Sequence, residues 1–115
     1  MSYMLLIVEP VGQRRERSEA EGHHVYERML RFADTLKARG VLRASESLGS
    51  GARRLQKRDG RPDIVDGPFA EAKEMVGGFF LLDTASEDEA LAIAAECPAA
   101  EWCSVEVRQL APCYV

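Results

Sequence analysis

The sequence predicts an α+β domain in which two helices pack against one face of an antiparallel β-sheet. Two segments with apolar residues at helical spacing each follow a Ser that has a Glu three residues later, the capping-box pattern of a helix N-terminus. Four other segments are either continuously apolar or alternate apolar with polar residues, as strands do. The pair Asp59-Gly60 lies between two short charged segments and indicates a tight hairpin turn.

The N-terminal third of the chain predicts a strand and then a long helix. Residues 3–9 are almost wholly apolar and form the first expected strand. Ser18 and Glu21 make the capping box of the first helix, and Gly40 suits the left-handed residue that ends it. The apolar face of this helix consists of Val25, Met29, Phe32, Ala33 and Leu36.

The middle of the chain predicts a strand at residues 41–48, a hairpin at residues 52–65 and a strand at residues 78–84. After the hairpin, Asp66-Gly67-Pro68 indicates a sharp turn, because Gly67 accepts unusual dihedral angles and Pro68 fixes φ. We expect a short helical turn at residues 70–74 to follow it.

The last third predicts the second helix and the last strand. Ser86 and Glu89 form a second capping box, and the helical pattern stops at Pro98. Residues 102–110 alternate apolar with polar and form the final strand. The order is therefore β-α-β-(hairpin)-β-α-β, which predicts a ferredoxin-like βαββαβ arrangement with an inserted hairpin.

Two of these strands bear on assembly. Residues 3–8 and 79–82 are apolar on both faces, and they are the central strands of a ferredoxin-like sheet. Two helices cover only one sheet face, and each large side chain exposed on the other face forgoes about 1.5 to 3 kcal/mol of burial. We therefore expect a homodimer through sheet faces, a dimeric α/β barrel with a partly polar cavity for a small-molecule ligand.

The composition is that of a single globular domain spanning residues 1–115. The first apolar segment is too short for a signal peptide or a membrane span, which predicts a cytoplasmic protein without a membrane partner. Cys97, Cys103 and Cys113 form no CxxC pair, so we expect buried free thiols.

Charge is unevenly distributed along the chain. Residues 1–61 carry 13 basic and 8 acidic side chains, whereas residues 62–115 carry 2 and 11. The basic segment 53–61 has no aromatic residue that stacks on bases, which favours a solvated hairpin over nucleic-acid binding.

The segment Asp66-Gly67-Pro68-Phe69, continued by residues 70–74 and 76–83, resembles the signature of DGPF proteins within the YCII-related superfamily. The resemblance implies the ferredoxin-like fold and the dimeric barrel. The YCII-related relatives are similar in fold to ring-degrading isomerases and monooxygenases. Some of these relatives carry a His and Asp pair proposed to be catalytic. Here the corresponding positions hold an apolar residue near Met29 and the pair Cys97-Pro98, so that mechanism is not carried over.

Carboxylates cluster directly after the hairpin. We expect Asp66, Glu71 and Glu74 to lie at the rim of the cavity and to raise the pKa of one carboxyl toward that of a general base. Lys73 would then be either a counter-charge to these carboxylates or the group that holds a substrate anion. The structural alternative is that Asp66 caps the turn that follows it.

Other candidates lie at the two ends of the chain. Glu106 and Arg108 share one face of the last strand, and we expect Arg108 to bind a substrate carboxylate in the cavity or to pair with Glu106 or Asp66. Tyr3 is either a hydroxyl donor or a core residue, and His24 is either a base or an exposed helical residue.

No metal or cofactor is expected. His23 and His24 point about 100° apart on a helix and cannot chelate one ion together, and no phosphate-binding glycine loop is present.

Two functions remain open on this basis. One is a cofactor-free enzyme that acts on a small organic acid or ring-derived metabolite through Asp66 or Glu71, with Arg108 as the anchor. The other is a non-catalytic ligand-binding or regulatory module, which the resemblance associates with sigma-factor signalling.

Overall fold

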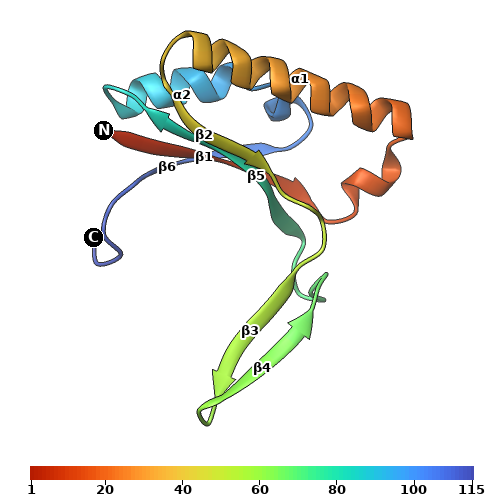
Figure 1. The fold of residues 1–115 in the computed structure, drawn as a ribbon. Helices are drawn as coiled ribbons and strands as arrows, with labels where there is room; N and C mark the ends of the chain where they lie inside the picture. The colour runs from red at the N-terminus through yellow and green to blue at the C-terminus, as the bar shows by residue number, and fades with distance from the viewer.

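The computed structural model describes residues 1–115 and has two layers, a four-stranded antiparallel sheet and two helices on one face of it (Figure 1). The strand order is β2-β5-β1-β6, which is the ferredoxin-like order and confirms the predicted α+β class. The strands span β1 (Ser2–Pro10), β2 (Leu42–Ser47), β5 (Glu74–Asp83) and β6 (Ser104–Gln109).

Both helices begin at the predicted Ser residues. The helix α1 (Glu19–Ala38) has the full capping box at Ser18, and Gly40 after it has a φ of 74°. The helix α2 (Glu87–Glu96) has half of the expected box: the Ser86 side chain accepts from the Glu89 amide, but the Glu89 carboxylate accepts from the amide of Ala85. Two short 3₁₀ helices, η1 (Gln13–Glu16) and η2 (Pro98–Glu101), were not predicted.

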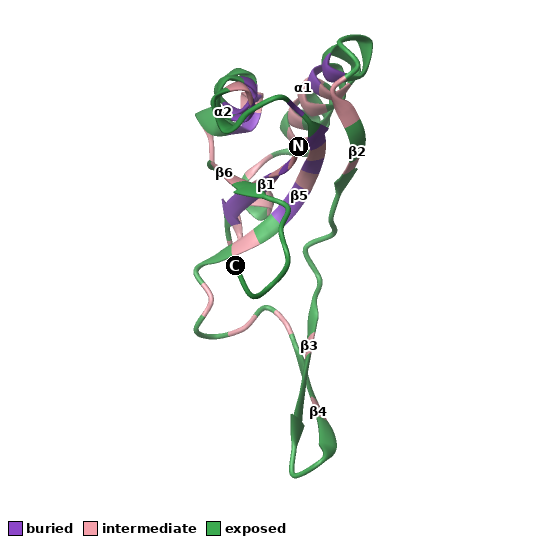
Figure 2. Cartoon of the chain, turned by 90° about the vertical axis from the view of Figure 1, so that its left-hand side faces the viewer, coloured by how far each residue is buried: buried purple, intermediate pink, exposed green.

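The inserted hairpin forms a separate two-stranded sheet, and we call it, residues 53–66, the arm. It consists of β3 (Arg53–Arg58) and β4 (Arg61–Asp66), with Asp59 and Gly60 at positive φ in the turn, as predicted. The Gly67 amide donates to the Ala52 carbonyl oxygen at 2.6 Å and closes the base of the arm. Figures 1 and 2 show the arm projecting from the sheet on the side opposite the helices.

The short helical turn predicted at residues 70–74 is present only at its start. A single turn at residues 70–71 is followed by β5, which begins at Glu74. The Ala72 amide donates to the Phe69 carbonyl oxygen, and the Lys73 carbonyl oxygen then accepts from the Val11 amide at 2.9 Å. This second hydrogen bond ties Lys73 to the chain just beyond β1 and draws the segment into the sheet.

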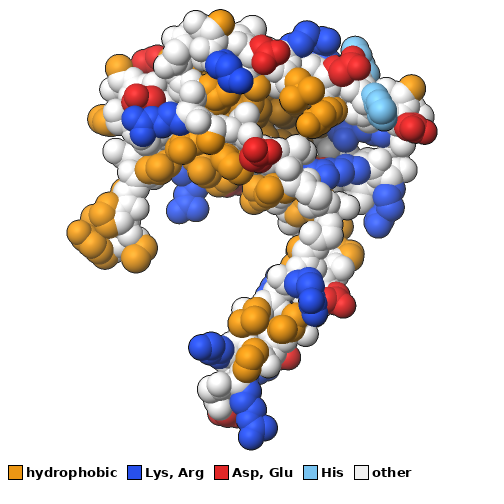
Figure 3. All heavy atoms as spheres, in the orientation of Figure 1, with side chains coloured by type: hydrophobic (Ala, Val, Ile, Leu, Met, Phe, Trp, Pro, Cys, Tyr) orange, Lys and Arg blue, Asp and Glu red, His pale blue; other side chains and the backbone are white.

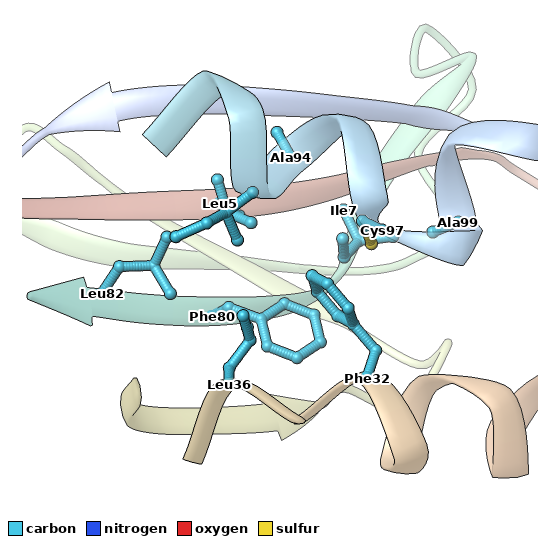
Figure 4. Packing of buried hydrophobic residues seen from close by; sticks show 10 residues of the cluster. Leu5, Ile7, Phe32, Leu36, Phe80, Leu82, Ala94, Cys97 and Ala99 are labelled. Atoms are coloured by element: carbon cyan, nitrogen blue, oxygen red, sulfur yellow. The ribbon is translucent and has the colours of Figure 1, made fainter. Parts of the chain in front are cut away.

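The core lies between the helices and the inner face of the sheet. Leu5, Leu36, Leu82 and Ile93 are fully buried, and the rings of Phe32 and Phe80 meet edge to face with centroids 5.1 Å apart (Figure 4). This packing fixes α1 over β5 and β2, while α2 packs over β1 and β6.

The outer face of the sheet is apolar at its centre. Met4 is opposite Leu81 and Leu6 is opposite Phe79, and all four are half-buried in the single chain. On β6, Arg108 lies beside Met4 and Glu106 lies beside Leu6, so both charged residues are on this outer face. We call the four apolar residues the sheet patch: Met4, Leu6, Phe79 and Leu81.

Two further findings concern the thiols and the helices. All three cysteines are free, but only Cys97 is buried as expected: Cys103 is half-buried, and Cys113 is exposed because it lies in the segment that follows β6. Neither helix combines the length and the hydropathy that a membrane crossing requires.

Candidate functional site

A cavity of about 330 Å³ lies between α1 and the sheet. The helix supplies an apolar wall of Val25, Tyr26, Met29, Leu30 and Ala33, and the sheet supplies Ile7 and Phe80. In Figure 3, hydrophobic side chains lie beneath α1, and basic side chains lie near its N-terminal end. A largely apolar cavity of this volume with a few polar groups suits a small organic molecule.

One carboxylate lies in the wall of this cavity. Glu9 is in phase with Leu5 and Ile7 on β1, so its side chain points to the helical side, and it is only 6% exposed. Arg14 from η1 donates to Glu9 through Nη2 at 2.6 Å and through Nε at 3.0 Å. This ion pair compensates the buried charge, which would otherwise be costly.

Arg14 also holds the neighbouring backbone. Its Nη1 donates to the Leu48 carbonyl oxygen at 2.8 Å, and its Nη2 donates to the Gly77 carbonyl oxygen at 3.3 Å. The guanidinium therefore joins η1, the end of β1, the exit of β2 and the start of β5. Because its donors are used in this way, Arg14 is mainly a structural group of the cavity.

Gly77 provides the space for this pair. A Cβ atom on Gly77 would lie 1.7 Å from Oε1 of Glu9 and 2.9 Å from Nη2 of Arg14. The pairing register between β1 and β5 shifts next to this point, between Ile7 and Val8, as in a β-bulge. No side chain fits at residue 77 while the ion pair keeps its place.

A second positive group lies beside an aromatic ring. The guanidinium carbon atoms of Arg17 and Arg28 lie 5.8 Å and 5.3 Å from the centroid of Trp102. Arg28 forms an ion pair with Glu101, whereas Arg17 donates only to the neutral Oε1 of Gln13, at 3.2 Å. Arg17 is thus a cavity cation without a carboxylate partner.

A thiol completes the polar part of the cavity. Cys103 Sγ donates to the Ala99 carbonyl oxygen at 3.2 Å. Burial, together with the negative charge of Glu9 and the nearby Cys97, raises the pKa of Cys103 to about 11. Burial also raises the pKa of Cys97. At neutral pH the Cys103 thiol is protonated and is therefore a weak hydrogen-bond donor, not a nucleophile.

The carboxylates expected to be catalytic lie at the base of the arm. Asp66 is exposed and accepts from Arg53 Nε at 3.0 Å, instead of capping a helix. Glu71 is also exposed, and the hydrogen bond from Arg54 lowers the pKa of its carboxyl, opposite to the expected direction. Lys73 is exposed on the same connection. None of these three side chains lines the cavity beneath α1.

The remaining candidates are dispersed. His24 is exposed on α1, in a shallow depression shared with His23 and Glu27. Tyr3 is 4% exposed on the inner face of the sheet. Glu106 and Arg108 are on the outer face, away from the cavity. Glu74 is exposed at the start of β5 and does not line the cavity either. The structure therefore brings together residues other than the eight that the sequence suggested, and no three His, Cys, Asp or Glu side chains form a metal-binding group.

The fold and the cavity together define the class: a ferredoxin-like α+β domain with a cavity of metabolite size between its long helix and its sheet. Residues 1–113 match the family described as the YCII-related domain. The chain belongs to this family.

Two further proteins are similar to the chain. An uncharacterized protein, R00369, of Rhizobium meliloti (strain 1021) is 45% identical over 64 residues, which are 54% of this chain and 52% of that protein. The matched part thus spans about half the length of this curated relative. The 5-chloro-2-hydroxyhydroquinone dehydrochlorinase of Burkholderia phenoliruptrix AC1100, solved with 2,5-dihydroxybenzoquinone, has a TM-score of 0.54 at 18% identity. That alignment covers 96% of this chain and 94% of the dehydrochlorinase, and it shows a shared fold.

Proposed function

We propose that the chain is a cofactor-free enzyme that takes a small ring-derived metabolite into the cavity beneath α1 and acts on it by acid/base chemistry through Glu9. The observation that carries the proposal is that Glu9 is the one buried charged residue of the chain and lies in the wall of a mostly apolar cavity. Buried carboxylates in such cavities are candidates for acid/base groups.

The cavity also suggests the class of ligand. Its apolar wall of α1 side chains suits a ring, and Trp102 offers an aromatic surface beside it. The unpaired guanidinium of Arg17 suits an acidic oxygen on the ring. A ring compound is what the dehydrochlorinase of similar fold holds in its structure, and the proposal extends that class to this chain.

A second candidate function is a non-catalytic ligand-binding module, with the regulatory role in sigma-factor signalling that the DGPF resemblance implies. One observation favours it: both carboxylate oxygens of Glu9 already accept hydrogen bonds from Arg14. A base held in this way needs Arg14 to move before it takes a proton.

A ligand screen with matched variants separates these candidates. Purified protein is screened against pools of small aromatic and ring-derived acids, with thermal shift for binding and mass spectrometry for turnover. Ala33→Trp fills the cavity, and Ala20→Trp is the control on the exposed side of the same helix. Binding that Ala33→Trp leaves intact would exclude the cavity as the ligand site.

The chemistry is tested with both charges removed, because breaking only one partner of a buried pair costs stability. Turnover should be lost in Glu9→Gln/Arg14→Gln and retained in the exposed control pair Arg39→Gln/Glu96→Gln. Binding without turnover in the wild-type protein would favour the non-catalytic module.

The arrangement expected from the sequence stays open as a proposal. Asp66, Glu71 or His24 would act as the acid or base, and Arg108, Lys73, Glu106 or Tyr3 would bind the substrate, if a second subunit brought them together. Asp66→Ala and Arg108→Ala test it in the same screen: loss of turnover in these variants, with Glu9→Gln/Arg14→Gln still active, would place the chemistry there and not at Glu9.

We also propose that the chain is a cytoplasmic DGPF-type member of its family and forms a homodimer through its outer sheet face. The free cysteines are consistent with a reducing compartment. The sheet patch is the apolar centre of this face, and Glu106 and Arg108 lie beside it. An apolar centre within a polar rim is the usual composition of a protein interface.

A further inference from the structure

The single chain is less compact than a globular domain of its length. Its radius of gyration is 16.0 Å, whereas a compact domain of this length has about 13 Å. The excess comes from the arm, whose strands contact each other and have only marginal contacts with any other element. An isolated two-stranded hairpin is at best marginally stable in water, so the arm needs a surface to pack on.

The arm presents apolar groups for such a surface. Leu55 and Ile64 are cross-strand neighbours, and they are 56% and 49% exposed. Figure 3 shows hydrophobic side chains along the arm between basic ones. In Figures 1 and 2 the arm extends on the side of the sheet opposite the helices, which is the side of the sheet patch. Whatever covers the sheet patch therefore lies next to the arm.

We propose that the arm clasps a second copy of the chain, reaching past the partner's sheet to the side of its helical layer. This proposal rests on the sheet-face dimer proposed above. Each strand of the arm is six residues long, so the arm reaches about 20 Å. Packed sheets are about 10 Å apart, so an arm of this length extends beyond the partner's sheet.

Charge favours the same partner. The arm (residues 53–66) carries five basic and three acidic residues, which leaves ten basic and sixteen acidic residues for the rest of the chain. The arm and the body of the chain thus have net charges of opposite sign. In a two-fold dimer each positive arm meets a negative body, whereas the acidic body repels nucleic acid.

The area of the contact is also appropriate. A face of four strands, each about six residues long, measures about 400 Å² in projection, from the strand spacing and rise. One face of an arm adds about 200 Å², and in a two-fold dimer each subunit gains this area twice, through its own arm and under the partner's arm. The total approaches the roughly 800 Å² that each partner buries in a standard interface. The sheet faces without the arms provide only about half of this area.

The test measures dimer dissociation by analytical ultracentrifugation of the full chain and of three variants. In the first, residues 53–66 are replaced by Gly-Ser-Gly-Ser. This short linker can join the two ends because Ala52 and Gly67 are neighbours that share a hydrogen bond. The second is Leu55→Asn/Ile64→Asn. The control is Ala92→Asn/Ala95→Asn, at two exposed positions of α2 on the side of the helix that faces away from the sheet and that the arm does not reach.

We expect both arm variants to weaken the dimer at least about tenfold and the control to leave it unchanged. If the variant without the arm has the same dimer dissociation constant as the full chain, the proposal that the arm binds the partner is wrong, while the sheet-face dimer remains possible. A wild-type chain that stays monomeric would overturn both proposals, while the ligand screen on the cavity would be unaffected.

Cross-linking identifies the surface that the arm contacts. Subunits labelled with ¹⁴N and ¹⁵N are mixed, exchanged and treated with a carbodiimide, which joins the arm's Lys57 to adjacent carboxylates. We expect cross-links that join Lys57 of one subunit to a carboxylate outside the arm of a subunit with the other isotope label. Cross-links found only between residues with the same label would contradict the proposal. Binding of a labelled DNA duplex that requires the arm, with an unchanged dimer, would identify nucleic acid as its occupant instead.

Discussion

Replacing Gly77 by Ala tests the packing of the cavity directly. The added Cβ would lie 1.7 Å from Glu9 Oε1, 2.7 Å from Glu9 Cδ and 2.9 Å from Arg14 Nη2, so the carboxylate has to leave its place. Arg14 then loses its carboxylate partner, and Glu9 becomes a buried charge without compensation. Breaking a buried ion pair in this way costs about 3 to 5 kcal/mol, which is a large part of the stability of a small domain.

The assay is urea unfolding followed by circular dichroism, at one fixed protein concentration because dimer formation shifts the midpoint. Gly22→Ala is the matched control, because nothing lies within 4 Å of a Cβ at that position and Ala is the better helix residue. We expect Gly77→Ala to lose about 3 kcal/mol or more and Gly22→Ala to gain up to about 1 kcal/mol.

A double-mutant cycle identifies the cause of the loss. In Glu9→Ala the side chain that collides with the new Cβ is absent, so Gly77→Ala should cost little in that background. An equal cost in both backgrounds would refute the steric explanation. A Gly77→Ala protein within about 0.5 kcal/mol of the wild type would refute the packing itself.

Three further predictions follow from the same structure. Because the folded state keeps the Cys103 proton up to about pH 11 while an unfolded thiol loses it near about pH 8.5, the unfolding free energy should fall as pH rises between these values. In Cys103→Ser this pH dependence should be reduced; an unchanged pH profile would contradict the shift. Iodoacetamide at pH 8 should alkylate the exposed Cys113 first, with mass spectrometry as the readout; equal labelling of Cys103 would argue against its burial. Light scattering should give twice the 12.8 kDa chain mass, and Leu81→Glu, in the sheet patch, should give the monomer; a Leu81→Glu dimer would exclude pairing through this face.

The fold was predictable because its signals are local. Ser18 with Glu21 starts α1, and Asp59-Gly60 sets the turn of the arm, each within a few residues of sequence. The pairing of Arg53 with Asp66 was also within reach, since the two positions are equally distant from that turn and face each other in the register. Reading Asp66 as a helix cap overlooked this symmetry.

The cavity was not predictable to the same extent, because its parts come from distant segments. Glu9, Arg14 and Gly77 meet only after β1 and β5 have paired. One signal was present in the sequence: Glu9 is in phase with Leu5 and Ile7, so a strand with those residues in the core also directs Glu9 inward. Nothing local indicated that Arg14 would reach back to it.

The position of β1 in the sheet also affects how the chain folds during synthesis. β1 is synthesised before the other strands of its sheet, yet both of its neighbours, β5 and β6, follow more than sixty residues later. At about 5 to 20 residues per second, a strand apolar on both faces waits for several seconds without a pairing partner. The helix α1 is synthesised next and carries apolar residues of the core on the inner side of the sheet, whereas Met4 and Leu6, on the sheet-patch side of β1, gain their cross-strand neighbours only after β5 and β6 have followed.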